Sequence, residues 1–129
     1  MFYTDYSTTR GVIAVTSADW TLPEPAAGTY ADELIGNAKN FSDTAMVVIG
    51  RVGGEGLDLP TDMKADGVTY NDNSKDYEDF PKGTHYLELS QSEKDMIDLV
   101  TKNFEKVVLV YNGANAFELN FVKDYPQIK

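Results

Sequence analysis

The sequence predicts an α/β fold, a three-layer α/β/α sandwich with a mainly parallel sheet that is incomplete within this chain. Short apolar, β-branched runs alternate with stretches of helical periodicity along the 129 residues, and this order is typical of parallel strands joined by crossover helices. Because three expected strands form a narrow sheet with open edges and the chain stops soon after the third, we expect the domain to continue beyond it. A small, complete three-stranded domain is the alternative.

The first half of the chain contains two expected strands and one helix. The run GVIAV at 11–15 fits a short buried strand, and Pro23 and Pro25 then indicate a connecting loop. Residues 30–41 have the spacing of an amphipathic helix, and the continuous apolar run at 44–50 is typical of a parallel strand covered on both faces. The apolar face of the helix is formed by Tyr30, Leu34, Ile35, Ala38 and Phe41.

The second half begins with a long loop at 51–87, which shows neither helical nor strand periodicity and whose length indicates a functional role. Ser90 and Glu93 have the spacing of a capping box and predict the start of a helix. A strand at 107–111 and a short helix at about 116–122 are expected to follow. The apolar face of the capped helix is formed by Met96, Ile97, Val100 and Phe104.

Composition fits one soluble globular domain and excludes several classes of partner. Hydrophobic residues make up 42% of the chain, which suffices for one core, and 21 acidic against 11 basic residues give a net charge of −10. We therefore expect no nucleic-acid and no membrane partner. The chain has no cysteine, which excludes disulfides, thiolate metal sites and a thiol nucleophile. No apolar run approaches the roughly 20 residues that span a bilayer.

The segment at 50–60 is the first candidate for chemistry because it follows the firmest strand, where open α/β sheets place their ligands. Its glycines lack the spacing of a dinucleotide fingerprint, and the chain has no phosphate-binding Gly-Lys-Ser or Gly-Lys-Thr. Three glycines around Glu55 suit a proton donor that a ligand can approach closely. A tight turn with a solvated acid is the alternative.

An acidic cluster inside the long loop suggests a calcium site only weakly. It consists of Asp72, Asp76, Glu78 and Asp79. Counted as a calcium-binding hand loop from Asp72, the cluster places Tyr77 where glycine is needed and Gly83 where the bidentate glutamate is needed. We therefore expect a solvated loop, with no metal ion and no cofactor.

His85 is the only histidine, so a multi-histidine metal site is excluded and we expect an ordinary loop residue. Ser, Asp and His all occur, but no serine lies in a Gly-x-Ser-x-Gly elbow. Several loop aromatics could form a platform for a sugar ring, although packing on the domain is the commoner outcome. They are Trp20, Tyr70, Tyr77, Phe80 and Tyr86.

Four stretches together resemble a known family. They are the run FSDTAMVVIGRVGGEGLDLP at 41–60, YLELSQSEK at 86–94, the Pro-Glu-Pro at 23–25 and KVVLVYN at 106–112. From about Trp20 onward the chain is similar to the C-terminal α/β-sandwich domain of family 3 glycoside hydrolases of the β-glucosidase type. On this resemblance the whole chain, 1–129, is a partial domain of that kind.

The resemblance implies that Glu55, in the Gly-Glu-Gly loop, is the general acid/base of a retaining β-glycosidase that cleaves β-glucosides or β-xylosides. It makes 51–87 an active-site loop, and we expect Arg51 and Asp58 to bind the carbohydrate substrate. The aspartate nucleophile would come from an N-terminal barrel domain, which this sequence lacks.

Two further expectations follow from the missing nucleophile domain. The chain alone should be inactive, because transition-state contacts from the barrel are absent, and its open sheet edges should favour self-association. The alternative function is a non-catalytic carbohydrate-binding or domain-packing α/β module with the same fold.

Overall fold

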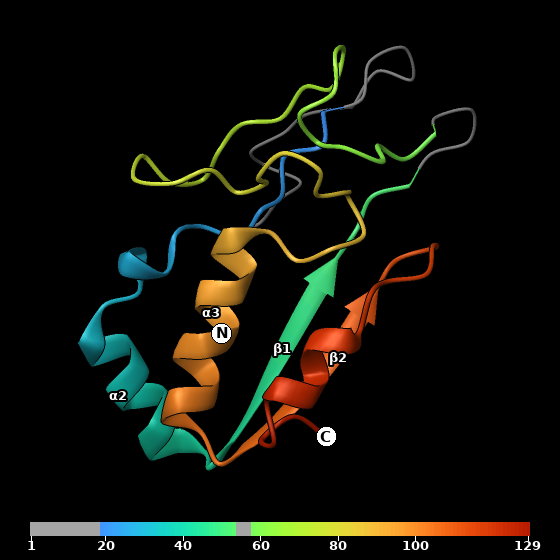
Figure 1. The fold of residues 1–129 in the computed structure, drawn as a ribbon. Helices are drawn as coiled ribbons and strands as arrows, with labels where there is room; N and C mark the ends of the chain where they lie inside the picture. The colour runs from blue at the N-terminus through green and yellow to red at the C-terminus, as the bar shows by residue number, and fades with distance from the viewer. Residues whose placement is uncertain (1–18, 54–57) are drawn as a thin grey trace.

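The computed structural model describes residues 19–53 and 58–129 and shows a mixed α/β fold (Figure 1). In chain order the elements are the 3-10 helix η1 (Ala27–Thr29), α2 (Asp32–Phe41), β1 (Thr44–Gly50), α3 (Gln91–Asn103), β2 (Lys106–Asn112) and the 3-10 helix η2 (Asn120–Asp124). In these ranges no helix has the length and apolar character needed to cross a membrane. The strand predicted at 11–15 lies outside the described residues.

The two described strands pair in parallel, as the sequence predicts. The register runs from Thr44 opposite Lys106 to Gly50 opposite Asn112. Parallel neighbours need a long crossover connection, and the loop after β1 together with α3 provides it. Both strands therefore end at the same edge of the sheet, where Figure 1 shows the long loop.

The C-terminal tail adds a short contact at the free edge of β2. The Val107 N–H donates to the Gln127 carbonyl at 2.9 Å, and the Lys129 N–H donates to the Val107 carbonyl at 2.9 Å. Val107 and Ile128 form a parallel bridge, and Ile128 is buried in the core. The tail therefore covers part of an edge that would otherwise present unpaired backbone groups.

The predicted capping box at the start of α3 is confirmed. The Ser90 Oγ accepts a hydrogen bond from the Glu93 N–H at 3.1 Å, and the Ser90 N–H donates to Glu93 Oε2 at 2.9 Å. The apolar face of α3 is buried as predicted, with Met96 and Ile97 in the same core cluster as Val47 of β1. The cap and the core contact together fix where α3 begins and which side it presents to the sheet.

The described helices cover one face of the sheet. Val47, Ile49 and Val107 on that face are buried in the main core. The opposite face is apolar but open to solvent, with side chains between 36% and 69% exposed. It is formed by Met46, Val48, Val108 and Val110. The described chain thus has two α-helices and a two-stranded parallel sheet, and the three-layer sandwich stays a prediction.

Helix α2 is found close to its predicted position, but its predicted apolar face is only partly covered, and no residue of the helix is fully buried. Ala38 packs against the main core, whereas Phe41, the last residue of α2, is 92% exposed. Lys39 Nζ lies 3.4 Å from Asn103 Oδ1, so α2 and α3 end near each other. The helix therefore contacts the core through Ala38, in its second half, and leaves its terminal aromatic ring in solvent.

The short helix predicted at 116–122 is replaced by η2, which begins later. The Glu118 N–H donates to the Leu87 carbonyl at 3.1 Å, across the chain. The Phe117 ring stacks on Tyr111 at 4.8 Å between centroids. Because these contacts commit the segment to the long loop and to β2, its backbone cannot form the helical ladder there.

The described parts of the long loop, 51–53 and 58–87, contain no helix or strand, which confirms the predicted lack of regular structure. A second, smaller core lies under this loop, and its members are Trp20, Leu22, Met63, Phe80 and Tyr86. The Trp20 and Tyr86 rings meet edge to face with centroids 4.8 Å apart. Three of the five loop aromatics are therefore buried packing residues, which leaves no room for them to act as a sugar platform.

Ser90→Ala should reduce the free energy of unfolding by about 1–2 kcal/mol, because it removes the side-chain acceptor of the α3 capping box. Urea denaturation followed by circular dichroism measures the change. Ser74→Ala is the control, because the Ser74 hydroxyl accepts a hydrogen bond from the Asp76 N–H within the loop and caps no described helix. Equal losses in the two variants would contradict the importance of the cap.

Candidate functional site

The candidate site lies at the carboxyl end of β1, where the chain leaves the sheet at Gly50. Glu55, the predicted acid/base, lies outside the described residues. The structure describes the two flanks of its segment, Arg51 to Gly53 on one side and Asp58 to Pro60 on the other. The base of the site can therefore be built from its contacts.

Arg51, the first residue after β1, is buried with all five of its guanidinium N–H groups engaged. Nε donates to the Tyr86 carbonyl at 2.8 Å, and Nη1 donates to the Gly50 carbonyl at 2.8 Å. Nη2 donates to the Glu88 carbonyl at 2.8 Å. The remaining two N–H groups form a bidentate pair with Glu93, at 2.6 Å to Oε1 and 2.7 Å to Oε2.

The Arg51–Glu93 pair is withdrawn from water, with side-chain exposures of 0% and 4%. The Arg51 Cζ atom also lies over two aromatic rings, 5.4 Å from the Tyr86 centroid and 4.8 Å from the Phe117 centroid. A buried charge is tolerated only when it is paired and fully hydrogen-bonded, and this pair meets both conditions. It fastens the end of β1 to the N-terminus of α3 and to the exit of the long loop.

Tyr86 holds both ends of the segment that carries Glu55. Its hydroxyl accepts a hydrogen bond from the Val52 N–H at 3.2 Å, and its own N–H donates to the Pro60 carbonyl at 3.2 Å. The ring is 1% exposed in the second core. The two attachment points of the segment are thus fixed by one buried side chain and its backbone.

Gly53 lies where the segment passes the loop after β2. A Cβ atom at Gly53 would come within 2.8 Å of Asn115 Nδ2, which is too close without movement of the amide. Arg51 also extends the β1 ladder, because its N–H donates to the Asn112 carbonyl at 3.1 Å. The absence of a side chain at Gly53 therefore permits the close approach of two loops at this edge.

The two residues predicted to bind substrate have different environments. Arg51 is buried and its donors are bonded to protein acceptors, so its observed contacts hold the fold together. Asp58 is exposed and is free to meet a ligand from solvent. A substrate-binding role for either residue stays a prediction.

The acidic loop is not simply solvated, since Asp79 is 1% exposed. Asp79 Oδ2 accepts from the Asn73 N–H at 2.7 Å, and Oδ1 accepts from the Ser92 N–H at 3.1 Å in the first turn of α3. The Asp79 N–H in turn donates to Asp72 Oδ1 at 2.8 Å. The carboxylate therefore caps a free helix N–H group and closes the loop around itself.

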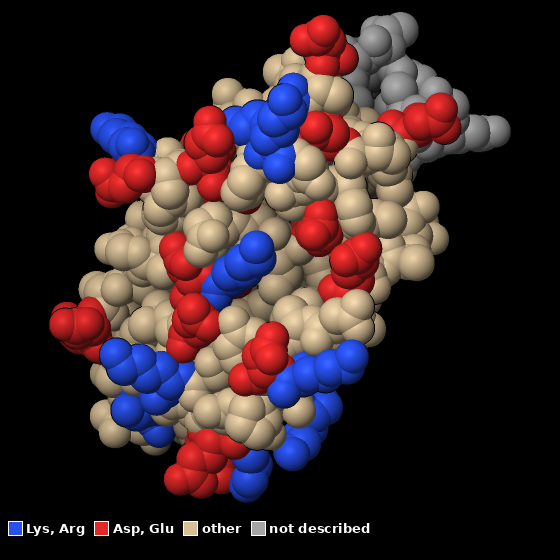
Figure 2. All heavy atoms as spheres, in the orientation of Figure 1, with Lys and Arg blue, Asp and Glu red and all other residues tan. Residues whose placement is uncertain are grey.

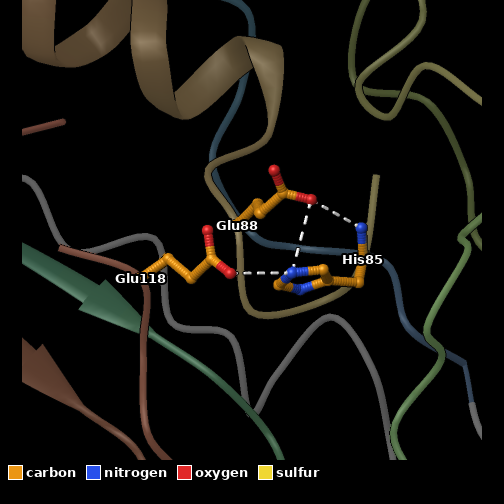
Figure 3. Close-up of side chains that lie close together, drawn as sticks. All are labelled: His85, Glu88 and Glu118. Atoms are coloured by element: carbon orange, nitrogen blue, oxygen red, sulfur yellow. Dashed lines mark hydrogen bonds and ion pairs between the residues drawn. The ribbon is translucent and has the colours of Figure 1, made fainter. Parts of the chain in front are cut away.

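His85 meets two carboxylates near the loop exit (Figure 3). Its Nε2 lies 3.0 Å from Glu118 Oε1 and 3.6 Å from Glu88 Oε2. The His85 N–H donates to the same Glu88 oxygen at 2.8 Å. The predicted loop histidine thus has two acidic neighbours, one from its own turn and one from the segment after β2.

Glu24 is the described carboxyl group whose environment most alters its chemistry. Burial raises its pKa from the ordinary 4.5 to about 7, and the negative charges of Glu93 and Asp79 act in the same direction. A hydrogen bond from the Tyr30 hydroxyl at 2.8 Å opposes the shift. The pKa of the Tyr30 hydroxyl is itself raised, first by burial and then by this hydrogen bond.

Sequence reasoning did not foresee the roles of Glu93, Tyr86 and Asp79. Glu93 was recognisable as a capping residue, but no local pattern links it to Arg51, 42 positions earlier. The sequence does hold one hint of the pair: a long loop begins with arginine and is followed by the glutamate that completes the cap.

On the face drawn in Figure 2, acidic side chains extend from end to end with basic ones between them, as the net charge of −10 leads us to expect.

Glu93→Gln should lower the free energy of unfolding by about 3–5 kcal/mol, because it leaves the Arg51 charge buried without its counter-ion while preserving the side-chain volume. Chemical denaturation gives the change. The matched control is Asp43→Asn, which breaks the solvent-exposed pair with Lys106 at 2.9 Å and should cost much less. A small loss for Glu93→Gln would show that the buried pair contributes little.

The deprotonation of Glu24 should lower the free energy of unfolding as the pH rises from about 4.5 to about 7. In that window the folded chain holds a proton on Glu24 that the unfolded chain has released, so folding is favoured at the acid end. Glu24→Gln should flatten this part of the curve of melting temperature against pH. Glu33→Gln, on the exposed side of α2, should leave the slope unchanged. An equal slope in wild type and Glu24→Gln would rule out this role.

Comparisons with known proteins relate the chain to β-glucosidases. It is 28% identical over 132 residues to β-glucosidase A from Butyrivibrio fibrisolvens, covering 98% of this chain and 15% of that protein. Its fold matches part of the crystal structure of a β-glucosidase from Paenibacillus barengoltzii, with a TM-score of 0.54 and 24% identity over 82% of this chain and 9% of that one. No protein-family model matches. The chain is therefore distantly related to β-glucosidases over most of its length and spans a small part of theirs.

Proposed function

We propose that this chain is part of the C-terminal sandwich domain of a family 3 glycoside hydrolase and supplies Glu55 as the general acid/base of a retaining β-glycosidase. The observation that carries the proposal is the fixed base of the Glu55 segment. Tyr86 forms hydrogen bonds with Val52 and Pro60, which flank the Glu55 segment on its two sides, at the carboxyl end of β1. The distant relation to β-glucosidases supplies the class of reaction.

A fixed base is what acid/base catalysis requires of a loop. A proton donor must meet the leaving oxygen within hydrogen-bond distance, and an error of about 1 Å can cost a hundredfold in rate. The Arg51–Glu93 pair and the Tyr86 hydrogen bonds hold the flanks of the segment against such displacement. The glycines beside Glu55 then leave space for a sugar to approach.

The proposed reaction has two steps that use the same carboxyl group. Glu55 first protonates the glycosidic oxygen while a carboxylate nucleophile attacks the anomeric carbon, and the glycosyl-enzyme intermediate forms as the alcohol leaves. Glu55 then accepts a proton from water, which attacks the same carbon and releases the sugar with retained configuration. The nucleophile comes from another domain, the N-terminal barrel, in this proposal.

The exposed apolar face of the sheet supports the proposal that the chain is part of a larger three-layer sandwich. Met46 and Val48 on β1 and Val108 and Val110 on β2 form an apolar surface of a kind that folded proteins usually cover. We assign it to the remaining helices of a three-layer sandwich. The chain spans 15% of the length of the Butyrivibrio enzyme, so such a layer would come from sequence outside this match.

The test places the chain in an active enzyme by replacing the matching segment of the Butyrivibrio β-glucosidase with residues 1–129. Glu55→Gln in this chimera should reduce hydrolysis of alkyl β-glucosides by about 10²–10⁴-fold, because the leaving oxygen loses its acid. For dinitrophenyl β-glucosides, whose leaving group needs no proton, Glu55→Gln should reduce the rate of the first step, formation of the glycosyl-enzyme, much less. Added azide should restore turnover by replacing the activated water.

The matched control is Glu105→Gln, which makes the same change at an exposed glutamate next to β2 and should leave both activities unaltered. Unchanged alkyl glucoside hydrolysis in Glu55→Gln would overturn the catalytic assignment and favour a domain-packing module. Hydrolysis by the isolated 129-residue chain would place the nucleophile among its own carboxylates and overturn the split active site.

A further inference from the structure

We propose that His85, Glu88 and Glu118 form a binding site for one Zn²⁺ ion that joins the exit of the long loop to the segment after β2. The proposal differs from the expectation that the chain binds no metal. It rests on the geometry of these side chains and does not depend on the proposed hydrolase activity.

Two of the three separations between the potential ligand atoms are already close to those that a zinc ion requires. Ligands about 2.0–2.1 Å from a tetrahedral zinc ion are about 3.3–3.4 Å from one another. His85 Nε2 is 3.0 Å from Glu118 Oε1 and 3.6 Å from Glu88 Oε2. One ligand atom from each of the three residues falls within a common span of 4.8 Å. Small side-chain rotations would bring all three to an ion between them.

Figure 3 shows the Nε2 edge of the imidazole turned toward both carboxylates. A neutral imidazole and two carboxylates carry a total charge of −2, which balances a divalent cation. Imidazole nitrogen with carboxylate oxygen is a donor set that zinc accepts, whereas calcium and magnesium prefer oxygen alone. A water molecule would complete the tetrahedron, because the side chains are 32%, 35% and 53% exposed.

Backbone hydrogen bonds hold the ligands in place before any ion binds. The His85 N–H donates to Glu88 Oε2 at 2.8 Å and so directs that carboxylate toward the imidazole. The Glu118 N–H donates to the Leu87 carbonyl at 3.1 Å and brings the second carboxylate to the same turn. Ligands oriented by such secondary contacts lose less freedom on binding.

The location gives the ion a structural task. Tyr86, which follows the ligand His85 in the sequence, holds the Val52 and Pro60 flanks of the Glu55 segment. Phe117, which precedes the ligand Glu118, packs over Arg51. An ion at this point would join two segments that already meet through the packing of Phe117 over Arg51 and through the Glu118–Leu87 backbone hydrogen bond. Zinc binding should therefore raise the melting temperature of the chain.

The experiment uses the 129-residue chain, freed of metal with a chelator, and zinc chloride as the probe. Because His85 is the only histidine and cysteine is absent, the imidazole ¹⁵N resonances report this site alone. We expect the Nε2 resonance to shift and to saturate at one ion per chain, with calorimetry giving the same stoichiometry. The melting temperature should rise with zinc and not with calcium.

Glu118→Gln and Glu88→Gln should each weaken zinc binding at least about tenfold, because each replaces a charged ligand by a neutral amide. Glu105→Gln, with the same change of charge at an exposed position, should bind as wild type does. Unmoved imidazole resonances at millimolar zinc would overturn the proposal. So would equal affinity in the wild type and the Glu88→Gln/Glu118→Gln double variant, since the ion would then bind the histidine alone.

Discussion

The buried ion pair between Arg51 and Glu93 is the constraint on which the rest of the structure depends. The guanidinium is a rigid fork with five donors, and each donor has a fixed acceptor on β1, on the loop exit or on α3. Removing either charge would leave the other in a water-free environment, so the geometry tolerates little variation. The long loop, 51–87, can therefore return to the sheet at a defined place, although it contains no regular structure in its described parts.

Inside this loop, carboxylates accept hydrogen bonds from backbone N–H groups, which in helices and strands are accepted by backbone carbonyls. Asp79 accepts N–H groups from Asn73 and from the first turn of α3, and Asp62 accepts those of Lys64 and Gly83. Each such bond satisfies a backbone donor that has no ladder partner. The many acidic residues of the chain thus include several with an internal structural role, and net charge alone does not reveal which they are. Burial is the main cause of the raised pKa of Glu24, and the negative charges of Glu93 and Asp79 near the N-terminus of α3 add to the shift.

The sequence was informative wherever one local pattern determined the outcome. Helix α3, its capping box and the parallel strands β1 and β2 follow from apolar periodicity and from Ser90 with Glu93, all within a few residues of each other. Key contacts at the candidate site join residues far apart in the sequence, such as Val52 with Tyr86, 34 positions on, and Arg51 with Glu93, 42 positions on, and no periodicity encodes them. The helix expected at 116–122 failed for the same reason, because Glu118 forms a distant backbone hydrogen bond. The apolar pattern of α2 includes its last residue, Phe41, and yet the side chain of Phe41 lies in solvent.

The division between a firm base and a glycine-rich segment has a physical rationale. Glycine gives the backbone conformational freedom, which allows close approach to a ligand but costs entropy when a single conformation is needed. That cost is lower if both ends of the segment are already fixed, because closing a short loop between fixed points restricts its path. Tyr86 fixes the ends at Val52 and Pro60 from within a hydrophobic core, where its ring packs on Trp20. The second core is thus more than a support for the long loop, since it determines where the flanks of Glu55 begin and end.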